Sequence, residues 1–121
     1  MTPVQEAQAQ ELIKKHLTLS GQTLDALRRA GLTEEQQVPI EFFFIAPNEK
    51  VAKALASHLE ESDCLNLSCE KTGGLLSRKW RLSGQTYPTQ IDVQVLAQWL
   101  PWIVVQGASY DCQFDGWGAE V

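Results

Sequence analysis

The side chains best suited to chemistry in this sequence are two histidines and three cysteines, and they are scattered along the chain. His16 and His58 both lie in stretches with helical periodicity, whereas nucleophilic catalysis needs a base beside a serine, cysteine or threonine. A metal site needs clustered ligands at short spacing. Cys64 and Cys69 have no second cluster near them, and Cys112 stands apart. We interpret the cysteines as small buried hydrophobes and the histidines as structural, and expect no catalytic residues, no metal and no cofactor.

The pair Gly73-Gly74 is the sequence's best candidate for a phosphate-binding loop. Such a loop places several glycines and the start of a helix directly after a strand. Here the glycines lie between two strand-like stretches, which favours a hairpin turn.

Length and charge limit the classes of function. The 121 residues fit one domain, and a net charge of −5 disfavours contact with a phosphate backbone. An acidic protein is suited to a basic segment of a protein partner. The polar start Met1–Gln10 and the odd number of cysteines favour the cytoplasm. The densest apolar stretch, Val93–Val105, is too short to span a membrane and contains Pro101.

The first third of the chain predicts a helical arm over residues 1–37. Apolar residues on one face predict a helix over 3–19 that ends at Ser20-Gly21. Thr23 is the expected cap of a second short helix, and Gly31 its end. We expect this arm to pack only loosely on the rest.

Residues 38–121 predict a domain of alternating strands and helices, which forms one globular unit with the arm. The expected strands cover residues 38–46, 65–70, 76–82 and 112–121. Asn48 is the expected cap of a helix that ends near Ser62-Asp63. Thr89 is the expected cap of a helix over 90–106, which Pro101 should kink or split.

This order, β-α-β-β-α-β, predicts an α+β protein with the ferredoxin-like fold. Its four-stranded sheet is antiparallel, its first and third strands are central, and both helices cover one face. The other face is open unless the N-terminal helices or a partner cover it.

Alternation along the strands predicts which side chains occupy the open face. They are Glu41, Phe43, Ile45, Lys79, Arg81, Asp115 and Trp117. Glu41 is expected to pair with Arg81 or Lys79. Apolar groups ringed by charges favour a protein-docking patch, and the alternative is a face covered by the N-terminal helices. RNA binding by stacking on Phe43 is disfavoured, because the third strand offers no matching aromatic residues and the protein is acidic.

Three stretches carry a resemblance to a known family: Ile40–Phe44, Ile91–Val95 and above all Phe114-Asp115-Gly116-Trp117-Gly118. They resemble the regulator of ribonuclease E activity B family, whose chains end in a Tyr or Phe followed by Asp-Gly-Trp-Gly. The resemblance implies a ferredoxin-like fold. It also implies inhibition of ribonuclease E by contact with the enzyme's disordered C-terminal scaffold region. Some members carry an acidic C-terminal extension, whereas this sequence ends at Val121.

The C-terminal motif also has a physical interpretation. Asp115-Gly116 suits a bend or bulge, because glycine takes positive φ at little cost. Trp117 then sets an indole against the sheet, and Gly118 allows close approach of the backbone. Gly116 and Gly118 are therefore expected to be structural.

Two other functions remain open from the sequence. One is a self-associating ferredoxin-like module, a monomer or weak homodimer, that binds a small ligand in its groove. The other is an enzyme of the small acylphosphatase type, which shares the topology. That enzyme needs an arginine in the loop after the first strand, and the loop Ala46–Glu49 has none. We therefore expect no enzymatic activity.

Overall fold

The computed structural model describes residues 1–74 and 76–121, and the elements named below lie within them. The helices are α1 (Pro3–Arg29), α2 (Glu49–Glu61) and α3 (Val93–Ala108). The strands are β1 (Gln37–Val38), β2 (Glu41–Ala46), β3 (Leu65–Lys71), β4 (Trp80–Gln85), β5 (Thr89–Gln90) and β6 (Gln113–Gly118). Within these residues, no helix is long and apolar enough to cross a membrane.

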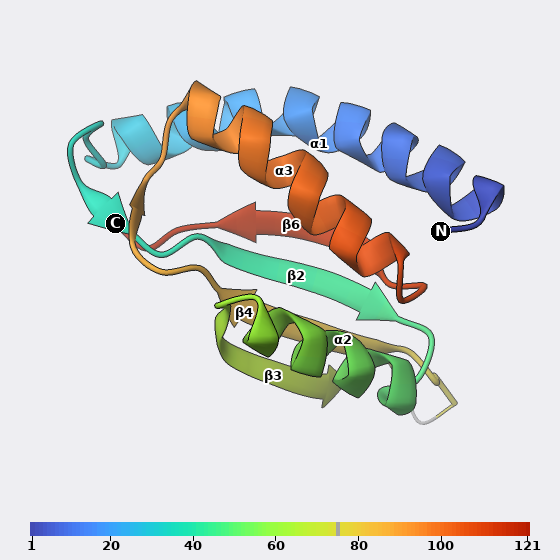
Figure 1. Ribbon diagram of the computed structural model, residues 1–121. Coiled ribbons are helices and arrows are strands. Elements are labelled where there is room, and N and C mark those ends of the chain that lie inside the picture. The colour runs from blue at the N-terminus through green and yellow to red at the C-terminus, as the bar shows by residue number, and fades with distance from the viewer. Residues whose placement is uncertain (75) are drawn as a thin grey trace.

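The main sheet has four strands in the order β3-β4-β2-β6, and every neighbouring pair is antiparallel. The prediction that the first and third strands are central is confirmed, because these strands are β2 and β4. The short strands β1 and β5 form a separate antiparallel pair. Figure 1 shows α2 and α3 on the same side of the main sheet and α1 running beside α3. The protein is thus α+β, as predicted.

Strand β2 supplies the centre of the core. Phe42, Phe44 and Ala46 are fully buried, whereas the residues between them are half-buried. The ring of Phe44 meets the ring of Phe114 from β6 edge to face, with centroids 5.5 Å apart. Burying a phenylalanine contributes about 1.5–3 kcal/mol, so these rings are a large part of the driving force for folding.

Helix α2 follows its sequence signals closely. The side chain of Asn48 accepts a hydrogen bond from the amide of Val51 at 2.9 Å, as its predicted role of cap requires. Leu55 and Leu59 are fully buried and form part of the apolar face of this helix. The ion pair Lys53–Glu49 at 2.6 Å is exposed and adds little stability.

Helix α1 corrects the prediction of two helices. It runs unbroken through Ser20-Gly21 and Thr23. Ser20 is buried, and its hydroxyl donates to the backbone carbonyl of His16 at 2.6 Å. Tertiary packing therefore overrides the weak helix propensity of these residues. Gly31 does end the helix, with φ of +110°, and the amide of Leu32 donates to the carbonyl of Leu27. Residues of α1 share one core with the rest of the chain.

Strand β4 corrects the predicted range of 76–82, because it begins at Trp80 and continues to Gln85. Leu76, at the start of the predicted strand, is 98% exposed, whereas Leu82 is buried. Gly84 belongs to the strand rather than to a loop. A Cβ there would lie 2.6 Å from both Phe42 and Leu67, so the glycine makes room for two core side chains.

Helix α3 starts later than predicted. Its cap is Asp92 rather than Thr89, and the Asp92 carboxylate accepts from the amide of Val95 at 2.8 Å. Pro101 lies inside the helix without splitting it. Near the end of the helix, a Cβ on Gly107 would lie 2.2 Å from the Phe44 ring. Glycine at this position lets α3 approach the sheet closely.

Two helical glycines give a matched test of this packing. We expect Gly107→Ala to lower the free energy of unfolding by about 1–3 kcal/mol, because the added methyl group overpacks the Phe44 site. The control Gly21→Ala meets no atom within 4 Å and should raise it by about 0.5–1 kcal/mol. Urea denaturation of the three proteins measures both values. Equal effects would show that close approach at Gly107 is unimportant.

Candidate protein-binding surface

One face of the main sheet is not covered by the helices. Glu41, Phe43 and Ile45 of β2 are each half-buried and alternate with the fully buried residues that face the helices. The N-terminal helix does not pack over Phe43. It lies on the other side, where the His16 ring meets Phe114. Among the described residues, the open face predicted for β2 is therefore accessible.

Phe43 is the centre of this face and is partly shielded by a cation. The guanidinium carbon of Arg81 lies 4.4 Å from the centroid of the Phe43 ring. The residues opposite Phe43 on the neighbouring strands are small, Ser83 on β4 and Gly116 on β6. A stacked arginine contributes about 0.5–1 kcal/mol at an exposed site. Because Arg81 stacks on the face of the ring and the opposite residues are small, the edges of the Phe43 ring remain accessible to a partner.

The expected ion pair between Glu41 and Arg81 or Lys79 is not formed. The strand register places Glu41 opposite Gln85, whose side-chain amide donates to the Glu41 carboxylate at 3.4 Å. Arg81 lies opposite Ile45, four residues along β2. Lys79 precedes β4, and its backbone carbonyl accepts from Thr72 in the hairpin. Lys79 is therefore at the rim of the face.

The prediction that Trp117 lies on the open face is wrong. A bulge in β6 shifts the register, so that Phe114 faces Phe44 but Trp117 faces Phe42. Trp117 therefore lies on the core side. Its indole N–H donates to the hydroxyl of Ser20 on α1 at 2.8 Å. The bulge itself confirms the expectation for Asp115-Gly116.

The residues around the bulge differ in backbone conformation and in exposure. Gly116 has φ of +147°, which favours glycine over any residue with a side chain. Asp115 is exposed beside it. Gly118 pairs with Glu41 at the end of β6. The expected close approach of the backbone at Gly118 is wrong, because no atom lies within 4 Å of where its Cβ would be. Of the seven predicted surface residues, the structure thus keeps Glu41, Phe43, Ile45 and Arg81 together.

A seam between α1 and β6 joins the two ends of the chain. We define this seam as His16 and Ser20 of α1 with Phe114 and Trp117 of β6. The rings of His16 and Phe114 are 4.7 Å apart and nearly perpendicular. Sequence reasoning missed Ser20, because a serine followed by glycine resembles a helix end and nothing local marks its partner.

Burial in the seam lowers the pKa of His16. Desolvation is the main cause, and the positive charge of Lys15 acts in the same direction. The backbone of Phe114 and the charge of Asp115 oppose the shift but are weaker. Within the described residues, the His16 Nε2 atom has no hydrogen-bond partner. Burial in the folded protein therefore favours the neutral form of the His16 ring.

The cysteines are unsuited to nucleophilic chemistry. Burial raises the pKa of Cys64 to about 11 and that of Cys112 to about 12. Burial also raises the pKa of Cys69. All three are therefore thiols at neutral pH. In the described part of the chain, no group of three or more His, Cys, Asp or Glu residues is placed to hold a metal ion.

Comparison with known proteins decides the family. The family model described as regulator of ribonuclease activity B matches residues 18–119. The chain belongs to the regulator of ribonuclease activity B family. The match includes both Ser20 and Trp117, so the hydrogen bond of the seam lies inside the family region, whereas His16 lies outside it. A search of curated proteins found no match.

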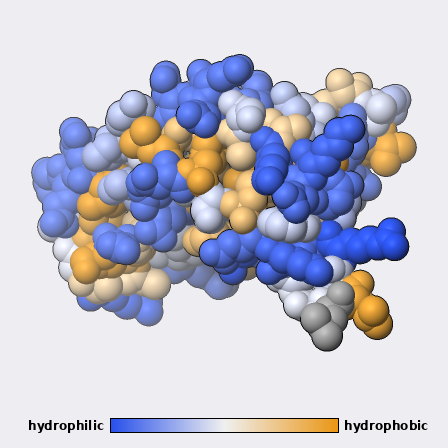
Figure 2. Space-filling view, turned by 90° about the horizontal axis from the view of Figure 1, so that it is seen from below, coloured by the Kyte–Doolittle hydropathy of each residue, from blue (hydrophilic) through white to orange (hydrophobic). Residues whose placement is uncertain are grey.

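The apolar surface is divided rather than continuous in one view of this family member. On the face in Figure 2, apolar areas are separated by hydrophilic residues. The size of these apolar areas alone therefore does not mark a binding site on that face.

Trp117 and Phe43 should respond differently to truncation. We expect Trp117→Ala to lower the free energy of unfolding by about 3 kcal/mol, because it removes core packing and leaves Ser20 without its donor. Phe43→Ala should cost about 1 kcal/mol, mainly the loss of the contact with Arg81. Urea denaturation measures both, and a larger loss for Phe43 would contradict the face assignment.

The seam should make stability depend on pH. Because the pKa of His16 is lowered in the folded state, the unfolded chain binds a proton first as pH falls below the ordinary value of 6.5. Stability should therefore fall on acidification, by at most about 1.4 kcal/mol per pH unit from this residue.

Replacing His16→Leu should flatten this part of the dependence, as measured by urea denaturation between pH 7.5 and 5.5. The matched control His58→Gln leaves the seam intact and should retain the slope. Identical slopes for the native protein and the His16→Leu variant would disprove the assignment.

Proposed function

We propose that this protein inhibits ribonuclease E by binding the enzyme's C-terminal scaffold region. The observation that carries the proposal is the family match over residues 18–119, since the family's description names regulation of ribonuclease activity. The resemblance of the motif Phe114–Gly118 adds the specific enzyme. On this proposal the protein alters the assembly of the RNA-degrading complex and slows the turnover of some messenger RNAs, without chemistry of its own on RNA.

Charge supports a protein partner rather than RNA. The net charge is −5, and the segment from Leu82 to Val121 contains no Lys or Arg. Nucleic-acid affinity depends largely on Lys and Arg that neutralise phosphates. An acidic surface instead favours encounter with a basic, disordered segment and makes the encounter sensitive to salt.

We assign the contact to the face around Phe43. The ring lies on the central strand β2, with Ile45 beside it and the charged side chains of Glu41 and Arg81 around it. Lys79 and Asp115 are exposed at the margins. An apolar centre within a polar rim is the usual anatomy of a protein interface. Trp117, with Gly116 and Gly118, supports this face from behind through β6.

We assign the fold to the ferredoxin-like group, and the strand order β3-β4-β2-β6 with antiparallel neighbours supports this assignment. We also propose that the protein acts in the cytoplasm as a monomer or weak homodimer.

A calorimetric titration against the C-terminal region of ribonuclease E tests the function. We expect saturable binding that weakens as salt is raised. Phe43→Ala should reduce the affinity about tenfold or more, as expected for a central interface aromatic. The control Leu17→Ala removes another exposed apolar side chain, 41% exposed on α1, and should bind normally.

Two results would contradict this proposal. Absence of binding at both low and high salt would refute ribonuclease E as the partner. Equal loss of affinity in the two variants would refute the face. Size-exclusion chromatography of the same samples shows whether the protein instead self-associates, which the alternative of a ligand-binding dimer predicts.

A further inference from the structure

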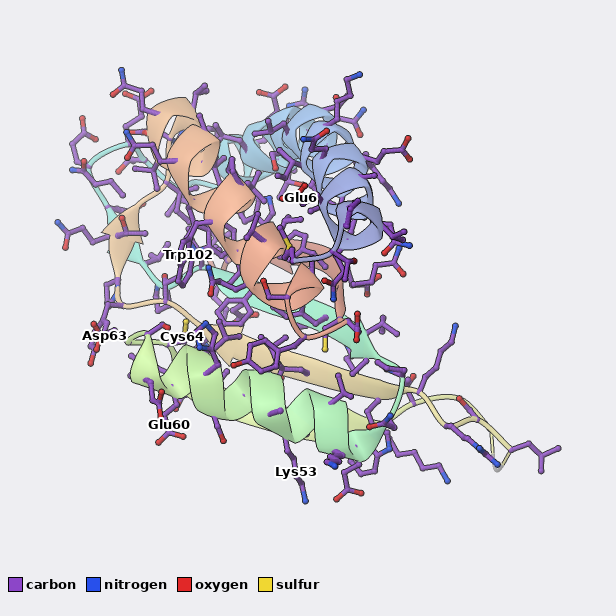
Figure 3. All side chains as sticks on the ribbon, turned by 45° about the vertical axis from the view of Figure 1, so that its right-hand side comes forward. Glu6, Lys53, Glu60, Asp63, Cys64 and Trp102 are labelled. Carbon is purple, nitrogen blue, oxygen red and sulfur yellow. The ribbon has the colours of Figure 1, made fainter. Side chains whose placement is uncertain are left out.

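A groove on another part of the surface lies where the end of α2, the turn between β4 and β5, and α3 meet. Its walls include Asp63, Cys64, Tyr87, Pro88, Trp99 and Trp102. In Figure 3, Trp102, Cys64 and Asp63 lie close together near the C-terminal end of α2, and Lys53 lies farther along that helix. The groove is thus built from three separate segments of the chain.

Three aromatic side chains, Tyr87, Trp99 and Trp102, form part of the walls of this groove. Tyr87 is 57% exposed and Trp102 is 38% exposed, which is a large apolar area to leave in water. Trp99 and Trp102 are three residues apart on α3 and therefore lie on the same side of the helix. Within the described residues, the indole nitrogen of Trp99 has no hydrogen-bond partner. Rigid aromatic faces of this kind are suited to stacking against a planar group.

The charge around the groove has one sign. Asp63 is the only charged residue among those that line it, and Glu60 and Glu61 precede it at the end of α2. The chain contains no Lys or Arg between Lys53 and Lys71 or after Arg81. These two segments supply nearly all of the walls, so the one charge among the lining residues, that of Asp63, has no Lys or Arg beside it in the walls.

Negative charge is unfavourable at this position, the C-terminal end of α2. The C-terminal end of a helix favours cations, because its last carbonyls carry a partial negative charge. Helix α2 instead ends with Glu60 and Glu61, followed by Asp63 at φ of +67°. A cation that enters the groove would interact favourably with the Asp63 carboxylate and with the C-terminal end of α2.

Cys64 adds apolar surface rather than reactivity. Burial and the charge of Asp63 raise the pKa of its thiol to about 11, so the thiol remains protonated at neutral pH. The groove is therefore suited to binding and not to covalent chemistry.

We propose that this groove binds an arginine side chain presented by an extended segment of a protein partner. The guanidinium group is planar, stacks on aromatic faces and donates two parallel hydrogen bonds to a carboxylate. Trp102 and Tyr87 supply the faces, and Asp63 supplies the carboxylate. This surface is distinct from the face around Phe43, and the inference does not depend on which ribonuclease the protein regulates.

An NMR titration with synthetic peptides tests the proposal on the full chain. The probe is a blocked eight-residue Gly-Ser peptide with two arginines, and the matched peptide carries citrulline, which keeps the shape but lacks the charge. Each of the four tryptophans carries one indole N–H, and the titration follows the signal of each. We expect the arginine peptide to shift the signals of Trp102 and Trp99, leave those of Trp80 and Trp117 unchanged, and bind more tightly than the citrulline peptide.

Three variants separate the contributions of stacking and charge. Trp102→Leu keeps an apolar side chain but removes the ring, and should weaken binding about three- to thirtyfold. Asp63→Asn removes the charge and suits the positive φ at this site, because asparagine tolerates that conformation. It should weaken binding of the arginine peptide without unfolding the protein. The control Glu6→Gln changes net charge equally on the exposed start of α1 and should bind normally.

Several outcomes would overturn the proposal. Equal binding of the citrulline peptide, or equal weakening by Glu6→Gln and Asp63→Asn, would show that no specific cation site exists. Tighter binding of an uncharged proline-rich peptide would assign the groove to a different class of segment. Shifts of the Trp102 signal with protein concentration alone would assign it to self-association. Because the peptides are synthetic, each result stands apart from the ribonuclease titration.

Discussion

The structure depends on the space given to two phenylalanine rings of the central strand. Phe42 and Phe44 fill the gap between sheet and helices, and each faces a position where a side chain would not fit. Gly84 on β4 leaves room for Phe42, and Gly107 on α3 leaves room for Phe44. Each large phenylalanine ring on β2 thus lies against a glycine, which has no side chain, on a neighbouring element. This pairing allows native packing density without strain. The distance between α3 and the sheet, and with it the outer surface of α3, follows from this match.

The extra residue in β6 decides which side chains of that strand lie on each face of the sheet. Without the bulge, the register of Phe44 with Phe114 would continue and place Trp117 opposite Glu41, on the same face of the sheet as Phe43. With the bulge, Trp117 turns to the core and joins Ser20, while Gly116 faces Phe43. One inserted residue therefore converts an exposed indole into an anchor for α1 and leaves the Phe43 ring accessible. The residues of the family motif are therefore explained by the fold itself, without reference to a binding partner.

The sequence predicts what is local and fails where distant contacts decide. Asn48 and the spacing of Leu55 and Leu59 determine α2 within a few residues, so that helix was predicted nearly as it is. The break at Ser20-Gly21 was wrong, because a hydrogen bond to Trp117, 97 residues away, keeps the serine inside the helix.

The open face was predicted in part for the same reason. The alternation of Phe43 within β2 is local, whereas the positions of Arg81 and Trp117 depend on register and on the bulge. The contact between α1 and β6 also has a consequence for synthesis. Ser20 precedes Trp117 by 97 residues, so their hydrogen bond forms only after β6 has been synthesised. Before that point α1 can pack against α3, which precedes β6 in the chain, but it lacks its contact with β6.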